Sequence, residues 1–142
     1  MPAAADPSVR PGPDAECPCA WVPGRSLREC CGPLVLDGVL APTPEALMRS
    51  RYTAFVLRDA DHLWRTWHPR TRPAQVGDLD GVTWLGLEVL GTEAGGPDDS
   101  EGTVDFAAHF RTDAGERGAV REHSGFARRG GRWFYVDGDE LG

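Results

Sequence analysis

The sequence predicts an α+β domain in which helices cover one face of a curved antiparallel sheet, preceded by a small cysteine-rich metal knuckle. Hydrophobic residues follow a helical period between residues 43 and 68, and from residue 82 onward they alternate as in strands. Helices and strands segregated along the chain in this way are typical of α+β folds. All four cysteines precede both regions, between Cys17 and Cys31.

Length and charge limit the classes of function. A chain of 142 residues predicts one domain with a small appendage. The net charge of −7 argues against a general nucleic-acid binder, because neutralising phosphates supplies most non-specific affinity. Arg25 and Arg28, which lie between the cysteines, could still form a local basic patch that contacts ribosomal RNA. No apolar run is long enough to span a membrane.

The first sixteen residues are rich in proline and alanine, and we predict that residues 1–16 form a disordered tail. They contain no apolar segment after a basic start, so we expect no signal peptide. This predicts a cytoplasmic protein, because reducing compartments keep thiols free. Disulfides within the cysteine group are the alternative, and they would require an oxidising compartment.

The four cysteines predict a metal centre with Cys17, Cys19, Cys30 and Cys31 as ligands. Four thiolates complete a tetrahedral shell around zinc and leave no position for a substrate, so the site would be structural. Iron accepts the same ligands. We name residues 17–33 the knuckle; with a connector it occupies residues 17–42. A segment of this size cannot bury a core of its own, and a metal is the usual substitute.

Cys30 and Cys31 are neighbours, so their sulfurs must diverge to reach separate ligand positions. A helical turn does this, since consecutive residues project about 100° apart. Ser26 to Glu29 has the pattern of a capping box that begins such a turn. Gly32 is expected to end it in a left-handed conformation, and Pro33 to prevent its continuation.

Two helices open the main domain, which is predicted to span residues 43–142. Thr43 as N-cap and Pro44 at the first helical position predict a helix to about Asp59. Its apolar face includes one arginine, Arg51. A second helix is expected to begin at Asp61 as N-cap and to end before the proline that follows His68.

Four strands are then expected, and short glycine-containing turns make neighbouring strands antiparallel. Glu122 falls on the sheet face that meets the helices, as Arg51 falls on the helix face that meets the sheet. We predict that these two residues pair in the interior, with Ser124 or Tyr135 completing their hydrogen bonds. The predicted strands are residues 82–92, 103–111, 119–128 and 132–137.

The opposite face of the sheet carries His109 and His123, which are expected to lie directly across from each other. Two imidazoles could hold a metal only with a third ligand, and the sequence supplies none convincingly. An exposed or oligomer-facing pair is therefore expected, and this outer face is where a homodimer contact would form.

The knuckle resembles the SEC-C motif, which is found at the end of the preprotein translocase motor subunit and in several bacterial proteins. The resemblance depends on Cys17-Pro18-Cys19, Gly24-Arg25, Arg28-Glu29 and Cys30-Cys31-Gly32. Two extra residues precede Gly24, and Leu27 replaces the usual tyrosine. The resemblance implies a bound metal and a protein partner, associated with the translocase or the ribosome.

The main domain resembles the cone of the nuclear transport factor 2-like (NTF2-like) superfamily, and the whole chain resembles the YchJ family of uncharacterised bacterial proteins. Three blocks carry the second resemblance: residues 41–52, 67–73 and 131–138. Related cones include isomerases, dehydratases and hydrolases with a carboxylate or histidine deep in the pocket. The resemblance supplies no established activity for this family.

Two functions are therefore open. The first is a zinc-binding protein whose knuckle contacts a protein partner. The second is an enzyme or ligand-binding protein that uses the cone cavity, with Glu122 and Tyr135, or Glu88, as candidates for proton transfer. An arginine beside Glu122 would lower the pKa of that carboxyl and oppose a role as base. The sequence favours the first function.

Overall fold

The computed structural model describes residues 10–141 and confirms the α+β fold. All helices precede all strands, and no helix in the described part is long and apolar enough to cross a membrane. In chain order the elements are η1 (Leu27–Glu29), α1 (Gly32–Leu36), α2 (Pro44–Leu57), α3 (Ala60–Arg65), β1 (Val82–Ala94), β2 (Glu101–Thr112), β3 (Arg117–Arg129) and β4 (Arg132–Glu140).

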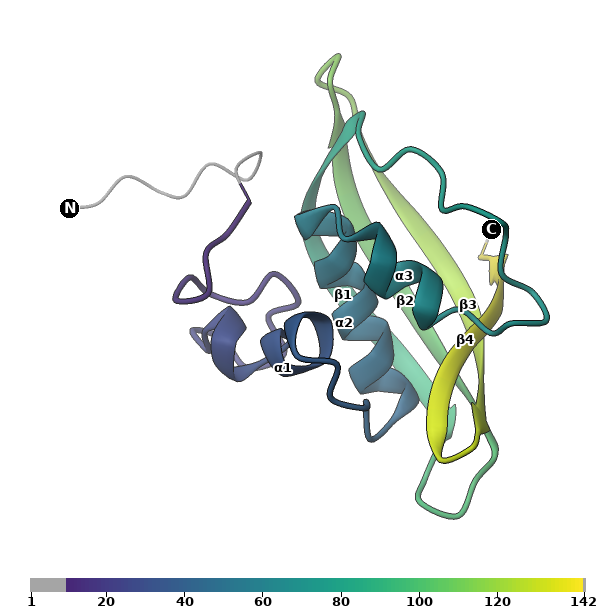
Figure 1. Ribbon diagram of the computed structural model, residues 1–142. Coiled ribbons are helices and arrows are strands. Elements are labelled where there is room, and N and C mark those ends of the chain that lie inside the picture. Colours follow the sequence, from purple (N-terminus) through teal and green to yellow (C-terminus); the bar gives the residue numbers. More distant parts are fainter. Residues whose placement is uncertain (1–9, 142) are drawn as a thin grey trace.

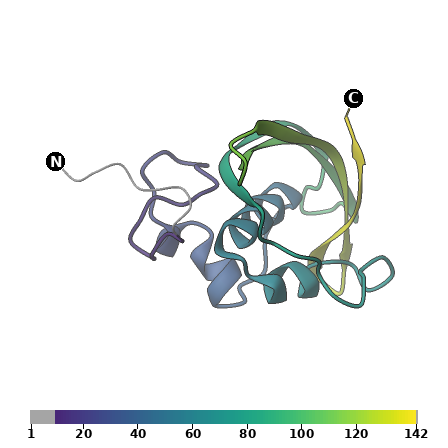
Figure 2. The ribbon, with the colours of Figure 1, turned by 90° about the horizontal axis from the view of Figure 1, so that it is seen from above.

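The sheet is antiparallel throughout, in the order β1-β2-β3-β4. It curves around α2, which lies in its hollow, and α3 packs on α2 (Figures 1 and 2). Register shifts interrupt β1 between Trp84 and Gly86 and between Val89 and Gly91. Such bulges bend a strand and increase its twist, which helps the sheet to curve. We call this sheet together with α2 and α3 the cone.

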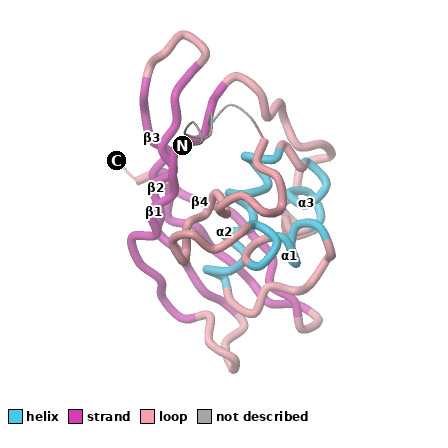
Figure 3. Tube along the Cα trace, turned by 90° about the vertical axis from the view of Figure 1, so that its left-hand side faces the viewer, coloured by secondary structure: helices cyan, strands magenta, loops and turns pink. Residues whose placement is uncertain are grey.

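Helix α2 is the centre of the molecule. The hydroxyl of Thr43 accepts a hydrogen bond from the Ala46 N–H at 3.1 Å, as predicted, and the left-handed Arg58 ends the helix. The sequence predicts one apolar face, yet Ser50 and Thr53 are also fully buried. The sheet covers one side of α2, whereas α1 and α3 lie on the other (Figure 3).

Helix α3 begins and ends earlier than predicted. Its N-cap is Asp59, which accepts a hydrogen bond from the His62 N–H at 3.1 Å, whereas Asp61 pairs with Arg65 at 3.2 Å. After Arg65 the chain joins the free edge of β4. A parallel bridge connects Trp67 with Tyr135. These backbone bonds to β4 stop the helix before the proline that was expected to end it.

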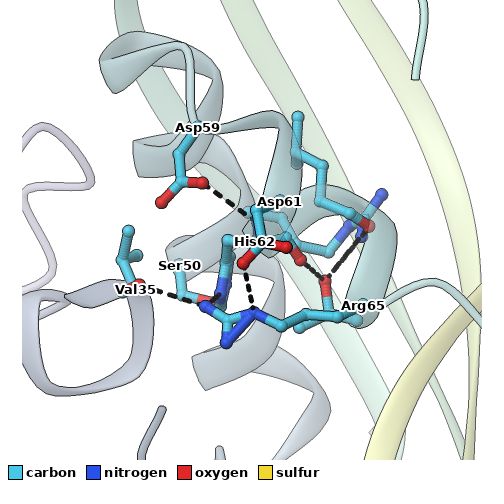
Figure 4. A network of polar contacts seen from close by, with 9 residues as sticks. Val35, Ser50, Asp59, Asp61, His62 and Arg65 are labelled. Carbon is cyan, nitrogen blue, oxygen red and sulfur yellow. Dashed lines mark hydrogen bonds and ion pairs between the residues drawn. The ribbon is translucent and has the colours of Figure 1, made fainter. Parts of the chain in front are cut away.

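A polar network joins the three helices around His62 (Figure 4). Arg65 donates to Val35 O at 3.1 Å and to Nδ1 of His62 at 3.2 Å. Nε2 of His62 must therefore carry the proton of the neutral ring, and it donates to Ser50 Oγ at 2.9 Å. Burial, with Arg65 and Arg51 adding to it, lowers the pKa of His62 to about 4. The imidazole is thus neutral at pH 7.

Arg51 and Glu122 do not form the predicted direct ion pair. Nη1 of Arg51 donates to Leu63 O and to Thr66 Oγ1, both at 2.8 Å. Glu122 Oε1 accepts from Ser124 Oγ at 2.8 Å and from the Tyr135 hydroxyl at 2.9 Å, so these two expected partners are present. The ring of Tyr135 lies 4.4 Å from the Arg51 guanidinium carbon. The tyrosine therefore takes the place between the two charges.

The two histidines of the outer sheet face do not oppose each other. Ala119 lies opposite His109, and Asp105 lies opposite His123, because the hairpin turns two residues earlier than expected. Nε2 of His109 lies 2.6 Å from Glu88 Oε1, and His123 pairs with Asp105. Each imidazole thus has its own carboxylate. Glu88 lies on an exposed face and is paired with His109, so it is not placed as a general base inside the cone would be.

Candidate metal centre

The four cysteine sulfurs lie within 4.8 Å of one another. Two of the separations are 3.5 Å, between Cys19 and Cys30, and 3.7 Å, between Cys17 and Cys19. A tetrahedral ion with metal–sulfur bonds of about 2.3 Å separates its sulfurs by about 3.8 Å. A disulfide would require about 2.05 Å, and all four cysteines are free. The geometry fits a four-thiolate metal site and not disulfides.

A tight hairpin presents Cys17 and Cys19. Cys17 N–H donates to Arg25 O at 2.8 Å, and Glu16 bridges to Ser26. Ala20 and Gly24 turn the chain between them in left-handed conformations, with φ of 50° and 83°. The chain is thereby folded back so that both sulfurs point to one place.

Residues 13–16 belong to the same structure and not to a mobile tail. Leu27 N–H donates to Ala15 O, and Arg28 N–H donates to Pro13 O, both at 2.8 Å. These bonds hold residues 13–15 against the start of η1. The prediction of a tail to residue 16 is therefore wrong for this part, and residues 1–9 lie outside the described residues.

The turn that presents Cys30 and Cys31 differs from its prediction at Gly32. Ser26 Oγ accepts from the Glu29 N–H at 3.3 Å and begins the short helix η1, as the capping pattern predicts. Gly32, however, is the first residue of α1, with Pro33 in its first turn. A Cβ at Gly32 would lie 2.6 Å from Leu27 O. Glycine is required there for a close backbone approach and not for a left-handed φ.

Three of the thiols are buried, and Cys30 is partly exposed. Hydrogen bonds with Cys19 and Cys31 lower the pKa of the Cys17 thiol, and the bond with Cys17 raises the pKa of Cys31. Burial raises the pKa of Cys30 to about 12. Three of the four thiols, those of Cys19, Cys30 and Cys31, therefore hold their protons more tightly than a free cysteine does. A cation that binds all four sulfurs must displace those protons.

The cone contributes two side chains beside the ligands, which sequence reasoning missed. Thr53 Oγ1 lies 3.7 Å from Cys17 Sγ. Arg49 donates to Cys19 O at 3.0 Å, and its guanidinium carbon lies 4.7 Å from the centre of the Trp21 ring. Both come from α2, one helical turn apart. In the sequence, their i, i+4 spacing indicates only that they share one face of the helix, and it does not reveal that this face contacts the cysteines.

Three spaces described within residues 10–141 lie away from the residues proposed for catalysis. A groove of about 690 Å³ lies between residues 10–20 and β1, a depression of about 360 Å³ lies on the sheet near Arg70, and a void of about 20 Å³ lies beside His62. None of these three spaces, all within residues 10–141, is lined by Glu122. Glu122 serves as acceptor for the buried Ser124 hydroxyl and the partly buried Tyr135 hydroxyl.

Two other arrangements fail as proton-transfer groups. Burial and the Glu122 charge raise the pKa of Tyr135, so its hydroxyl keeps its proton and donates it to Glu122. Ser50 and His62 are in contact, but the imidazole donates to the serine because Arg65 occupies its other nitrogen. His62 therefore cannot accept the Ser50 proton as the base of a catalytic dyad would.

Known families account for most of the chain. The family described as "YchJ, middle NTF2-like domain" matches residues 43–138. A UPF0225 protein of Streptomyces avermitilis is 50% identical, and the match covers 94% of this chain and 89% of that protein. The chain belongs to the YchJ family. A UPF0225 protein of Streptomyces coelicolor is 48% identical to this YchJ-family chain, covering 91% of it and 98% of the relative.

Two solved structures resemble most of the YchJ-family chain. A SEC-C motif containing protein from Rhodopseudomonas palustris is 36% identical with a TM-score of 0.75, covering 89% of this chain and 98% of that one. A SEC-C motif containing protein from Psychrobacter arcticus is 28% identical with a TM-score of 0.69, and the match covers 85% of this chain and 80% of that one. The SEC-C and NTF2-like resemblances are thus confirmed. Together with the cysteine cluster they fit a metal-binding protein.

Proposed function

We propose that this YchJ-family protein binds one zinc ion through Cys17, Cys19, Cys30 and Cys31. The observation that carries the proposal is the convergence of four sulfurs within 4.8 Å of one another, most of them buried. Four thiolates leave no open coordination position, so the ion would act as a structural centre. Iron is the alternative ion for this donor set.

The ion would stabilise a region with little regular structure. Helix η1 has three residues and α1 has five, and helices of this length are not stable alone. Binding of an ion to such a segment contributes directly to its folding free energy. A cytoplasmic location agrees with this role, because reduced thiols are the form that binds metal.

The knuckle would present a surface to a protein partner. Trp21 and Val22 are 44% and 42% exposed, and the exposed Arg25 lies on the same segment. Exposed aromatic and arginine side chains are the types enriched where proteins bind each other. An acidic partner surface would complement the arginine. The SEC-C resemblance supports a translocase- or ribosome-associated partner.

The metal is tested by elemental analysis of the full chain purified without chelator. We expect one zinc per chain in the wild type and none in the double variant Cys30→Ser, Cys31→Ser. A wild-type protein without bound metal would refute the zinc centre.

The partner is tested by affinity capture with three forms of the protein. The wild type, the cysteine double variant and Trp21→Ala are compared by mass spectrometry of what they retain. Trp21→Ala should keep its zinc and lose the partner, whereas the cysteine variant should lose both. Identical partner sets for all three forms would show that the knuckle is not the contact surface.

A further inference from the structure

One side of helix α2 lies against the segment that carries two of the sulfurs. Arg49 holds the Cys19 carbonyl at 3.0 Å, and Thr53 places its hydroxyl 3.7 Å from the Cys17 sulfur. Residues four apart lie on one face of a helix, so a single ridge of α2 contacts both ligands. This ridge belongs to the cone, whereas every sulfur belongs to the knuckle.

The Thr53 hydroxyl has the Cys17 sulfur as its hydrogen-bond partner. Thr53 has no exposed surface, and within residues 10–141 its Oγ1 has no hydrogen-bond partner other than Cys17 Sγ. Buried hydroxyls are normally paired, so a hydroxyl directed at a sulfur indicates a required contact. A thiolate that binds a metal has no proton to give. In the loaded site Thr53 must therefore donate and Cys17 must accept.

We propose that the metal centre is completed by the cone, with Thr53 as a positioning residue that donates a hydrogen bond to Cys17 and thereby sets the affinity for the ion. The inference rests on the proposed zinc site. Residues behind the metal ligands orient them and supply part of the affinity, and losing one typically weakens binding by about 10–100-fold. The knuckle would thus bind its ion tightly only when docked on α2.

The test compares Thr53→Val with Thr53→Ser in the full chain. Valine keeps the shape and removes the hydroxyl, whereas serine keeps the hydroxyl. Zinc affinity is measured by competition with a chromophoric chelator, and stoichiometry by elemental analysis. We expect one ion per chain in all three proteins, affinity weaker by about 10–100-fold in Thr53→Val, and affinity near the wild-type value in Thr53→Ser.

Ser50→Ala is the matched control for loss of a buried hydroxyl. Ser50 lies on the same helix and is also fully buried, but its hydroxyl contacts His62 and Leu47 O. This variant should lose stability while its zinc affinity stays unchanged. Equal weakening in Ser50→Ala and Thr53→Val would show general loosening of α2 and would overturn the proposal.

Cobalt substitution gives a readout that a purely structural role would not change. A hydrogen bond lowers the energy of the sulfur electrons that transfer charge to Co²⁺, so its loss should move the sulfur-to-cobalt absorption band to longer wavelength in Thr53→Val only. Wild-type affinity and an unshifted band in Thr53→Val would overturn the role of Thr53 and leave the zinc centre standing. Failure of the wild type to bind zinc would overturn both.

Discussion

The knuckle and the cone are held together by different physical means. The knuckle is formed by contacts between residues close in sequence: its sulfurs all come from residues 17–31, its helix η1 has three residues, and the helix α1 that begins at its end has five. The cone has strands of nine to thirteen residues and a hydrophobic core that brings distant segments together. A region too small for its own core needs an ion, and a larger one does not.

The two regions nevertheless share one core. Cys17, Cys19 and Cys31 belong to the same buried cluster as Leu47 and Tyr52 of α2. The difference between the regions therefore concerns what stabilises each of them, and not whether they are connected. The following predictions test that distinction.

Removing a ligand should have the largest effect. Cys19→Ser replaces a fully buried ligand, so we expect loss of the ion and a decrease in the free energy of unfolding of about 3 kcal/mol or more. Because the core is shared, calorimetry should show one unfolding transition that moves to lower temperature. Val22→Ser, an exposed change in the same hairpin, serves as control. A separate low-temperature transition would mean that the knuckle unfolds independently of the cone.

Acidification should have the next largest effect on stability, because it protonates His62, the buried neutral histidine of the cone. The pKa of His62 is lowered to about 4 in the folded protein, from an ordinary value of 6.5. The unfolded chain therefore binds the proton first, and stability is lost as the pH falls from about 6.5 to about 4. The lowered pKa corresponds to about 3 kcal/mol.

The metal centre is also sensitive to acid, so the His62 contribution is measured as a difference. Urea unfolding of the wild type and of His62→Gln is compared at pH 7 and pH 5, since both proteins keep the same cysteines. The wild type should lose more stability between the two pH values. Equal losses in the two proteins would assign the acid sensitivity to the knuckle alone.

Glu122→Gln should have the smallest of these effects and should be confined to the cone. The change removes the charge that accepts from Ser124 and Tyr135, and hydrogen bonds to a charged group are worth about 1.5–3 kcal/mol, of which the amide oxygen retains a part. We expect a loss of about 1 kcal/mol in urea unfolding and unchanged zinc content. Glu93→Gln, at an exposed position, is the control. Stability equal to wild type would show that this interior network is dispensable.

Local signals predicted local structure well. The capping pattern at Ser26, the N-cap at Thr43 and the starts of β1 and β4 lie where the sequence places them. Errors occurred where two capping residues compete or where a turn can close in more than one register. Asp59 and Asp61 are both good caps, and the hairpin after β2 could turn at either of two points. Asp59 caps the helix while Asp61 pairs with Arg65, and the sheet pairing fixed the register of the hairpin.

The cysteine spacing by itself determined which four side chains converge, because a hairpin and a short helical turn within residues 17–31 bring them together. The order of helices and strands likewise determined the α+β class. Only the tertiary structure decided that Tyr135 lies between Arg51 and Glu122, and that Thr53 and Arg49 lie behind the sulfurs. The contacts of Arg51 with Tyr135, of Thr53 with Cys17 and of Arg49 with Cys19 join residues 30 or more positions apart, and their geometry depends on how whole elements pack.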